Sequence, residues 1–170
     1  MTLTTGFSPI ATPDIRVLIL GSMPGVRSLE LNQYYGHPRN LFWPLMEELV
    51  GVPVDAPYEE RLIQLNAKGI GLWDSLKAAE RPGSLDASIV AHSEIVNDFP
   101  AFLAEHQQLR AIVFNGKKSE SAFTKHVLQA GHAGLFTEIA FLPMPSTSPA
   151  NASISLAEKR RRWTEILRYL

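Results

Sequence analysis

Residues 16–21 read RVLILG, a continuous run of leucine and β-branched residues that ends in glycine. Such a run is typical of a strand buried on both faces in a parallel sheet. Three further short apolar runs are of the same kind, at residues 69–73, 111–114 and 138–142. Segments that read as helices alternate with them, at residues 41–50, 57–67, 97–107, 117–129 and from 156 onward. This alternation predicts a three-layer α/β/α fold around a central, mostly parallel four-stranded sheet.

The chain has 170 residues, of which 45 % are apolar and 19 % are charged. This length and composition are typical of one globular domain, so we expect residues 1–170 to form a single domain. The chain contains no cysteine, which excludes disulfides, cysteine-held iron–sulfur clusters and thiol nucleophiles. The first residues lack a basic start followed by a long apolar run, and no apolar stretch approaches a bilayer span. We therefore expect a cytoplasmic protein with no membrane association.

The net charge of the chain and the spacing of its motifs argue against several classes of function. Sixteen basic and seventeen acidic residues give a formal charge of −1, which argues against a protein that coats long stretches of nucleic acid. The five histidines show no pair at metal-ligand spacing. The sequence GSMPG at residues 21–25 lacks the lysine of a P-loop and the third glycine of a dinucleotide motif. We expect neither a metal nor a nucleotide cofactor.

Two long polar loops follow the first and the fourth predicted strands, at residues 22–40 and 143–153. In a parallel α/β fold the ligand site lies beyond the carboxyl ends of the strands, where these loops begin. The first loop leads into QYYGHPRNLFWPL at residues 33–45, whose many aromatic side chains predict a stacking pocket. The second contains MPSTSPANAS at residues 144–153, whose hydroxyl groups suit contacts with phosphate. We expect both loops to meet the end of the second strand, residues 73–75, at one pocket.

In order and spacing, these motifs resemble those of the uracil-DNA glycosylase superfamily over most of the chain. GSMPG is similar to its first motif, and HPRNLFW is similar to the segment that follows in the mismatch-specific branch. MPSTS is similar to its second motif, a Pro-Ser loop that is pressed into the minor groove. The form YYGHPRN is closest to the hypoxanthine-DNA (deoxyinosine) glycosylase branch.

The resemblance implies a monofunctional enzyme that hydrolyses the N-glycosidic bond of a base flipped out of DNA. Hypoxanthine is the favoured base, and uracil is the alternative. The implied partner is DNA that contains a deaminated or mispaired base. The chemistry needs no cofactor, no protein partner is expected, and the protein is expected to be a monomer.

The resemblance also assigns a catalytic residue. In the mismatch-specific branch an asparagine of the first motif holds the attacking water, but the matching position here is Met23, whose thioether cannot do so. The hypoxanthine branch implies that Asn40 takes this role. Met144 likewise stands where several branches place a histidine or an asparagine. The two methionines motivate an alternative, a catalytically inactive protein that binds DNA lesions; a nucleoside or small-acid hydrolase on the same framework is a more distant one.

The other site residues implied by the resemblance surround the base and the DNA backbone. Phe42 is expected to stack on the extruded base, and Asp74 to accept a hydrogen bond from its edge. Backbone groups at Ser22 and Met23 are expected to donate to the leaving base, and Tyr35 to line the pocket. Contacts with DNA are expected from Pro145, Ser146, Thr147, Ser148 and Lys117.

Each of these residues also has a purely structural interpretation. Asn40 precedes a helical run and could serve only as its N-cap, and Asp74 could cap a helix in the following SLKAA. Phe42 could pack in the core, and the Ser146 hydroxyl could stabilise a turn. The basic run at residues 159–162 could be a solvated helix face.

Overall fold

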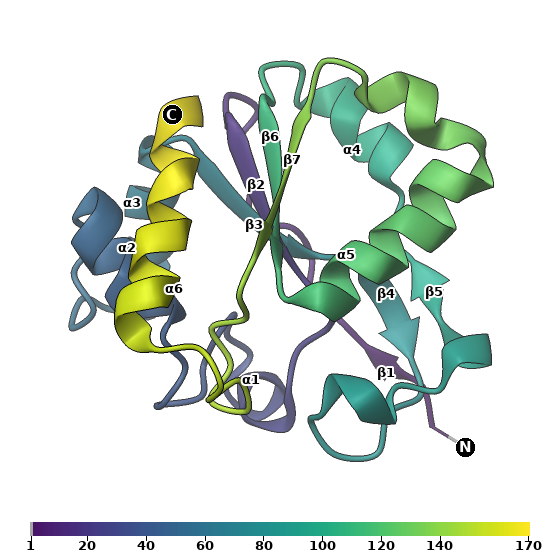
Figure 1. Ribbon diagram of the computed structural model, residues 1–170, viewed down its shortest axis with the longest axis horizontal. Helices are drawn as coiled ribbons and strands as arrows, with labels where there is room; N and C mark the ends of the chain where they lie inside the picture. The colour runs from purple at the N-terminus through teal and green to yellow at the C-terminus, as the bar shows by residue number, and fades with distance from the viewer. Residues whose placement is uncertain (1) are drawn as a thin grey trace.

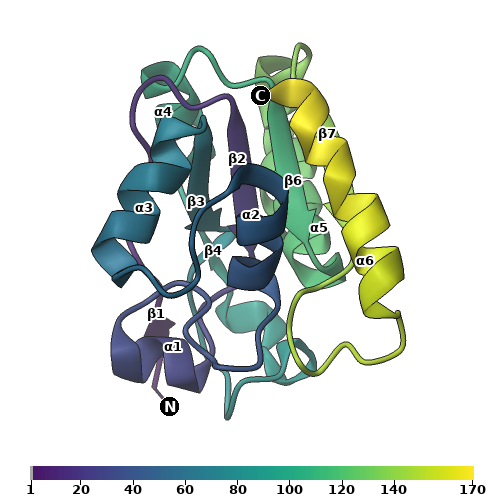
Figure 2. The ribbon, with the colours of Figure 1, turned by 90° about the vertical axis from the view of Figure 1, so that its left-hand side faces the viewer.

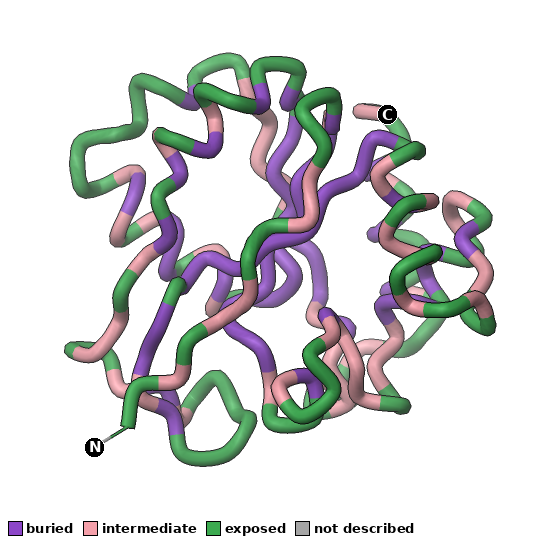
Figure 3. Tube along the Cα trace, turned by 180° about the vertical axis from the view of Figure 1, so that it is seen from behind, coloured by how far each residue is buried: buried purple, intermediate pink, exposed green. Residues whose placement is uncertain are grey.

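Four parallel strands form the centre of the computed structural model, which describes residues 2–170 (Figure 1). In sheet order they are β3 (Ile70–Asp74), β2 (Val17–Gly21), β6 (Ala111–Asn115) and β7 (Ala140–Met144). The strands β2, β3 and β6 are buried along their whole length, and Figure 3 shows this buried centre. Burial on both faces explains their continuous apolar sequences. The predicted fold class is confirmed.

Helices cover both faces of this sheet, as Figures 1 and 2 show. One face carries α2 (Phe42–Val50), α3 (Tyr58–Ala67) and α6 (Leu156–Trp163). The other carries α4 (Phe99–Glu105), α5 (Lys117–Phe123) and the π-helical continuation of α5 at Thr124–His132. Because successive strand residues point to opposite faces, Val17 and Ile19 join the first core, and Leu18 and Leu20 join the second. The sheet is thus fixed from both sides by large apolar side chains.

A small antiparallel sheet is formed, in order, by β1 (Thr4–Thr5), β4 (Leu76–Ala79) and β5 (Ile95–Val96). Here the structure corrects an interpretation of the sequence. The segment SLKAA forms strand β4 and not a helix, so Asp74 is not a helix cap. The cause is pairing with distant segments, since Leu76 lies opposite Val96 and Ala78 lies opposite Thr5. Such tertiary contacts override a local preference for helix.

Other predicted boundaries shift by a few residues. Strand β7 begins at Ala140 and not at residue 138, because the backbone nitrogen of Ile139 still closes a turn onto the Phe136 carbonyl at 3.1 Å. Helix α4 begins after Asp98, whose carboxylate accepts a hydrogen bond from the nitrogen of Ala101 at 3.0 Å. The remaining helical elements are α1 (Val26–Leu31) and the 3₁₀ segments Asp86–Ser88, Ala91–Ser93, Ala133–Phe136 and Thr164–Tyr169.

Candidate active site

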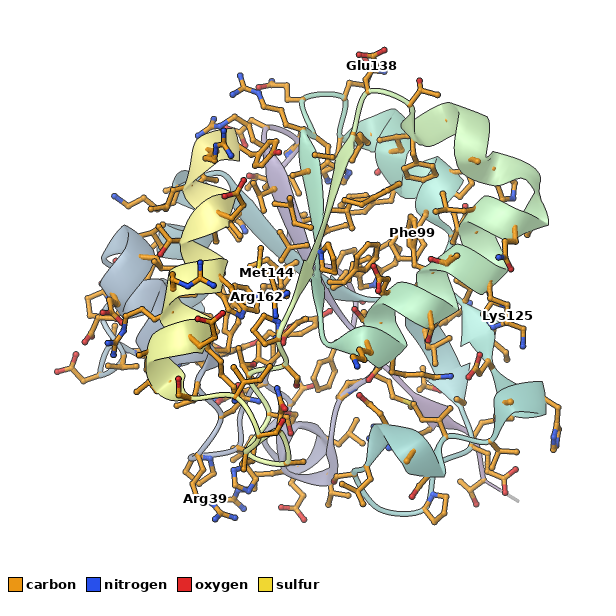
Figure 4. The ribbon with its side chains drawn as sticks, viewed as in Figure 1. Arg39, Phe99, Lys125, Glu138, Met144 and Arg162 are labelled. Carbon is orange, nitrogen blue, oxygen red and sulfur yellow. The ribbon has the colours of Figure 1, made fainter. Side chains whose placement is uncertain are left out.

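A cavity of about 660 Å³ opens at the carboxyl ends of the parallel strands. Its walls include residues of the segment 21–40 after β2, Asp74 at the end of β3 and residues 146–151 after β7. These loops meet at the lower end of the molecule in Figure 1, and Figure 4 shows Arg39 at their outer edge. The structure therefore brings together the three segments that we expect to converge because they follow the carboxyl ends of parallel strands.

Asn40 lies on the wall of this cavity at the start of α2. Its side-chain oxygen accepts a hydrogen bond from the backbone nitrogen of Phe42 at 2.9 Å, at the start of α2, but the N-cap position of this helix is Leu41. The interpretation of Asn40 as the N-cap is therefore wrong by one residue, although its side chain does hold the start of the helix. A carbonyl oxygen has two lone pairs, so this bond leaves room for a second donor from the cavity, such as a water molecule. The bond to the Phe42 nitrogen and a catalytic role are compatible at this position.

Thr147 joins the Pro-Ser loop to the neighbouring elements. Its backbone nitrogen donates to the Asn115 side-chain oxygen at 2.9 Å, and its hydroxyl accepts from the Asn115 side-chain nitrogen at 2.9 Å. Its carbonyl accepts from the backbone nitrogen of Leu41 at 3.0 Å. Thr147 is only 1 % exposed. The expectation that it contacts DNA phosphates is therefore wrong for this geometry, because the side chain is buried and its polar groups bond within the protein.

The rest of the Pro-Ser loop is also held by hydrogen bonds. The Pro145 carbonyl accepts from the indole nitrogen of Trp163 at 3.0 Å, and Pro145 itself is buried, so it is not an exposed DNA contact. The ammonium group of Lys159 donates to the carbonyl of Asn151 at 2.6 Å. Lys159 is only 3 % exposed, which corrects its assignment to a solvated helix face. Because these hydrogen bonds hold the backbone of the loop, its remaining polar groups have fixed positions.

Of the residues expected to contact DNA, two serines of this loop and one lysine are accessible to solvent. Ser146 and Ser148 are half-buried and line the cavity, and the Ser146 hydroxyl accepts from the nitrogen of Ser148 at 3.1 Å. Each hydroxyl keeps a proton with which it can donate. Lys117 is exposed at the start of α5, outside the cavity wall. Its neighbour Lys118 instead forms an ion pair with the buried carboxylate of Glu94.

The aromatic side chains near Asn40 are stacked. The rings of Tyr35 and Phe42 lie 4.0 Å apart between centroids, with 21° between their planes. Phe42 has no exposed surface and does not line the cavity, whereas Tyr35 does. In this conformation Phe42 cannot touch a base, contrary to the expectation, because the core encloses it and Tyr35 covers one face of its ring. The interpretation of Phe42 as a core residue is confirmed.

Asp74 ends β3 beside Gly21 of the neighbouring strand. A Cβ atom at Gly21 would lie 2.6 Å from Oδ1 of Asp74 and 3.5 Å from the Tyr35 hydroxyl, so a larger residue here would displace the buried Asp74 carboxyl. The pKa of Asp74 is raised to about 7, mainly by burial and also by the charge of Asp86, with Arg81 partly offsetting both. Within the described chain its Oδ2 atom has no hydrogen-bond partner. Asp74 is therefore a carboxyl that can exchange a proton near neutral pH in the cavity wall.

One wall of the cavity was not predicted. Residues 81–86 fold against the GSMPG turn, where the Ser22 hydroxyl donates to Asp86 at 2.5 Å and the Val26 nitrogen donates to the Ser84 hydroxyl at 2.8 Å. The buried guanidinium of Arg81 donates to the carbonyl of Pro24. The sequence signal was an arginine and an aspartate in a Pro-Gly loop that soon follows the second main strand. These contacts fix the backbone at Ser22 and Met23.

The two methionines of the motifs, Met23 and Met144, pack against apolar side chains. Met23 lines the cavity and packs on Leu76, Ala79, Ile89 and Ala122, and Met144 packs in the core under α2 and α6. Figure 4 shows Met144 between the sheet and α6. The positions at which the resemblance implies polar side chains are thus filled by apolar packing. Any catalytic polar group must come from elsewhere in the cavity wall.

Within residues 2–170, no three histidine, aspartate or glutamate side chains gather in a way that could hold a metal ion. Of the helices described, none is both long enough and apolar enough to cross a bilayer.

The fold and this cavity define an α/β protein with a site at the strand ends, and comparison with known proteins gives its family. The family model of the uracil DNA glycosylase superfamily matches residues 8–170. The chain belongs to this superfamily, and the expectation of a DNA glycosylase is confirmed.

Two curated relatives carry the name hypoxanthine DNA glycosylase. The protein from Methanosarcina barkeri is 37 % identical over 161 residues, which cover 94 % of this chain and 95 % of the relative. The protein from Methanosarcina acetivorans is 36 % identical over 165 residues, covering 96 % and 98 %. A solution structure from Methanosarcina acetivorans, described provisionally as a uracil DNA glycosylase, superimposes with a TM-score of 0.80 at 33 % identity and 98 % coverage of both chains.

Proposed function

We propose that this protein is a monofunctional DNA glycosylase that hydrolyses the N-glycosidic bond of a flipped-out deaminated base, with hypoxanthine favoured over uracil. The observation that carries the proposal is the cavity at the strand ends, which is lined by Asn40, Tyr35 and Asp74 among others. The names of the two curated relatives support hypoxanthine as the base.

The proposed chemistry begins with a base that has left the DNA stack, because the duplex hides the base edge. As the glycosidic bond breaks, the sugar approaches an oxocarbenium ion and the base leaves with the bonding electrons. The Asn40 oxygen positions a water for attack on the sugar carbon and faces its positive charge. Asp74 contacts the edge of the base. Backbone nitrogens at Ser22 and Met23, held by residues 81–86, donate to the departing base.

The proposed DNA surface surrounds the cavity. Ser146 and Ser148 donate to phosphate oxygens from the fixed Pro-Ser loop, and Lys117 and Arg39 supply exposed positive charge nearby. Local cations of this kind suit a protein whose formal charge is only −1. We further infer a monomer that acts in the cytoplasm; light scattering of the protein with and without DNA measures the number of chains.

A panel of oligonucleotides tests this function. Each carries one hypoxanthine, uracil, xanthine or unmodified base at the same position, and alkali then cleaves the strand wherever a base has been lost. We expect breaks with hypoxanthine and, more slowly, with uracil, and none in the unmodified strand. Tight binding to the modified strands without breaks would instead support the inactive lesion-binding protein that the buried Met23 and Met144 suggested.

A further inference from the structure

The carboxyl of Asp74 is buried in the cavity wall without a partner from the protein. Asp74 is only 4 % exposed, and its Oδ2 atom has no hydrogen-bond partner among residues 2–170. None of the ion pairs that these residues form includes Asp74. A buried carboxyl without a partner favours its protonated form, because burial disfavours the charge. Asp74 is therefore a carrier of a proton at the border of the proposed substrate cavity.

Charged and titratable groups face Asp74 from two segments of the cavity wall. Burial raises its pKa most, the carboxylate of Asp86 raises it as well, and the guanidinium of Arg81 lowers it, which leaves the pKa at about 7. The hydroxyls of Tyr34 and Tyr35 also lie within reach of its charge. Burial raises the pKa of both hydroxyls well above the usual range. Near neutral pH Asp74 therefore exchanges a proton while both tyrosines keep theirs.

A proton donor matters for the release of a purine base. When the C1′–N9 bond breaks, the bonding electrons go to the base, and a proton added to the ring avoids the release of an anion. Hypoxanthine can accept this proton at N7, a ring nitrogen with a free lone pair. Uracil has no such nitrogen, because N1 carries the sugar and N3 carries a hydrogen. The thioethers of Met23 and Met144 have no proton to give, whereas a protonated carboxyl in the cavity wall does.

We propose that Asp74 is a second catalytic residue beside Asn40, which acts in its protonated form and donates this proton to N7 of the departing hypoxanthine. The inference rests on the proposed function. In this step the O–H bond of Asp74 breaks, the N7–H bond forms, and the C1′–N9 bond breaks with its electrons passing to the base. Water held by Asn40 adds its oxygen to C1′ and releases a proton to solvent. The Asp74 carboxylate then takes up a proton from solvent, and the products are neutral hypoxanthine and an abasic sugar.

The single-turnover rate of hypoxanthine release as a function of pH tests the proposal. In the wild-type protein the rate should fall as pH rises through the pKa of Asp74, because the proton donor is lost. Asp74→Asn keeps the size of the side chain but has no proton to transfer, so its rate should be lower by about 100-fold near about pH 6. The two rates should converge as pH rises. The preference for hypoxanthine over uracil should also fall in Asp74→Asn, since uracil release does not use this proton.

The neighbours of Asp74 give a second measurement, the pH at which the rate is half-maximal. Arg81→Met removes a charge that lowers the pKa of Asp74, so this pH should rise. Asp86→Asn removes a charge that raises the pKa, so this pH should fall. Arg81→Lys keeps the charge and is the matched control, which should stay near the wild-type value. Loss of the hydrogen bonds that hold the GSMPG turn would lower the rate at every pH and would not produce opposite shifts.

Two results would overturn the proposal. One is a wild-type rate that does not change with pH across the neutral range. The other is a folded Asp74→Asn protein, checked by circular dichroism, whose rate is lower by the same factor at every pH, since Asp74 would then contact the base without donating a proton. A wild-type protein that releases no base at any pH would refute the proposed function instead.

Discussion

The carbonyl of Thr147 accepts a hydrogen bond from the backbone nitrogen of Leu41 at 3.0 Å, so the Pro-Ser loop is joined to the chain directly beside Asn40. Asn115, at the end of β6, holds the other polar groups of Thr147. The loop proposed to contact DNA and the residue proposed to position water are therefore parts of one hydrogen-bonded unit.

Thr147→Val tests this unit. The change leaves the buried Asn115 amide without its hydroxyl partner, which should lower the free energy of unfolding by about 1–3 kcal/mol. Base release in single-turnover assays should fall by about ten-fold, because the start of α2 shifts. Melting temperature and rate are measured together. Thr137→Val, at an exposed threonine, is the control and should change neither.

Asp74 makes stability depend on pH near neutrality. Burial raises its pKa to about 7, above the ordinary value of 3.8, so the folded protein binds the proton more tightly than the unfolded chain. Stability should therefore fall as pH rises from about 4 to 8. Asp74→Asn removes this effect and should be the more stable protein at pH 8 by at least about 1 kcal/mol, with the difference lost near pH 4. Denaturant unfolding at both pH values checks it; a difference independent of pH would contradict the assignment.

The buried carboxylate of Glu94 should make stability depend on pH in the direction opposite to that of Asp74. Burial opposes its ionisation, but hydrogen bonds from Lys118 and His126, the latter at 2.7 Å, outweigh burial and hold its pKa below the ordinary 4.5. Its stabilisation is present above about pH 4.5 and is lost as pH falls through the lowered pKa. Glu94→Gln should therefore destabilise the protein at pH 7 by about 1–3 kcal/mol and flatten its acid unfolding curve. Glu138→Gln, at the exposed residue labelled in Figure 4, should leave the curve unchanged.

Ser146→Asp tests the DNA surface. A new negative charge at the cavity mouth should weaken binding to all DNA sequences by about 1 kcal/mol, roughly five-fold, and more at low salt. The preference among bases should not change, because phosphate contacts carry no sequence information. Fluorescence anisotropy with modified and unmodified DNA measures both quantities. Thr137→Asp, the control, adds the same charge beside Glu138 and should have little effect on DNA binding. An altered base preference in Ser146→Asp would show that Ser146 does not act through contacts with phosphate.

The main sheet could be predicted from the sequence because its four parallel strands leave four apolar runs, three of which come from strands buried along their whole length. Strand β4 could not, since SLKAA has no strand pattern and becomes a strand only by pairing with residues far away, such as Val96. The place of the site followed from the long polar loops after the first and fourth predicted strands, because ligands bind beyond the carboxyl ends of parallel strands. Its finer features did not: the stacking of Tyr35 on Phe42 depends on a left-handed backbone at Tyr35, and the burial of Thr147 depends on a partner 32 residues away.

We propose that Asn40 performs the chemistry that Met23 cannot. Asn40→Ala removes both the group proposed to hold water and the side-chain bond to the Phe42 nitrogen at the start of α2. Loss of such a bond at a helix start costs about 1 kcal/mol of stability. Asp98→Ala removes the N-cap bond of α4, in which the Asp98 carboxylate accepts from the Ala101 nitrogen at 3.0 Å, and is the matched control.

The most direct test measures the single-turnover rate of hypoxanthine release beside the melting temperature in both variants. We expect a similar small loss of stability in the two variants. We also expect a rate lowered by at least about 100-fold in Asn40→Ala and nearly unchanged in Asp98→Ala. A folded Asn40→Ala protein that releases the base at the wild-type rate would contradict the catalytic role and leave Asn40 with only its structural bond to Phe42.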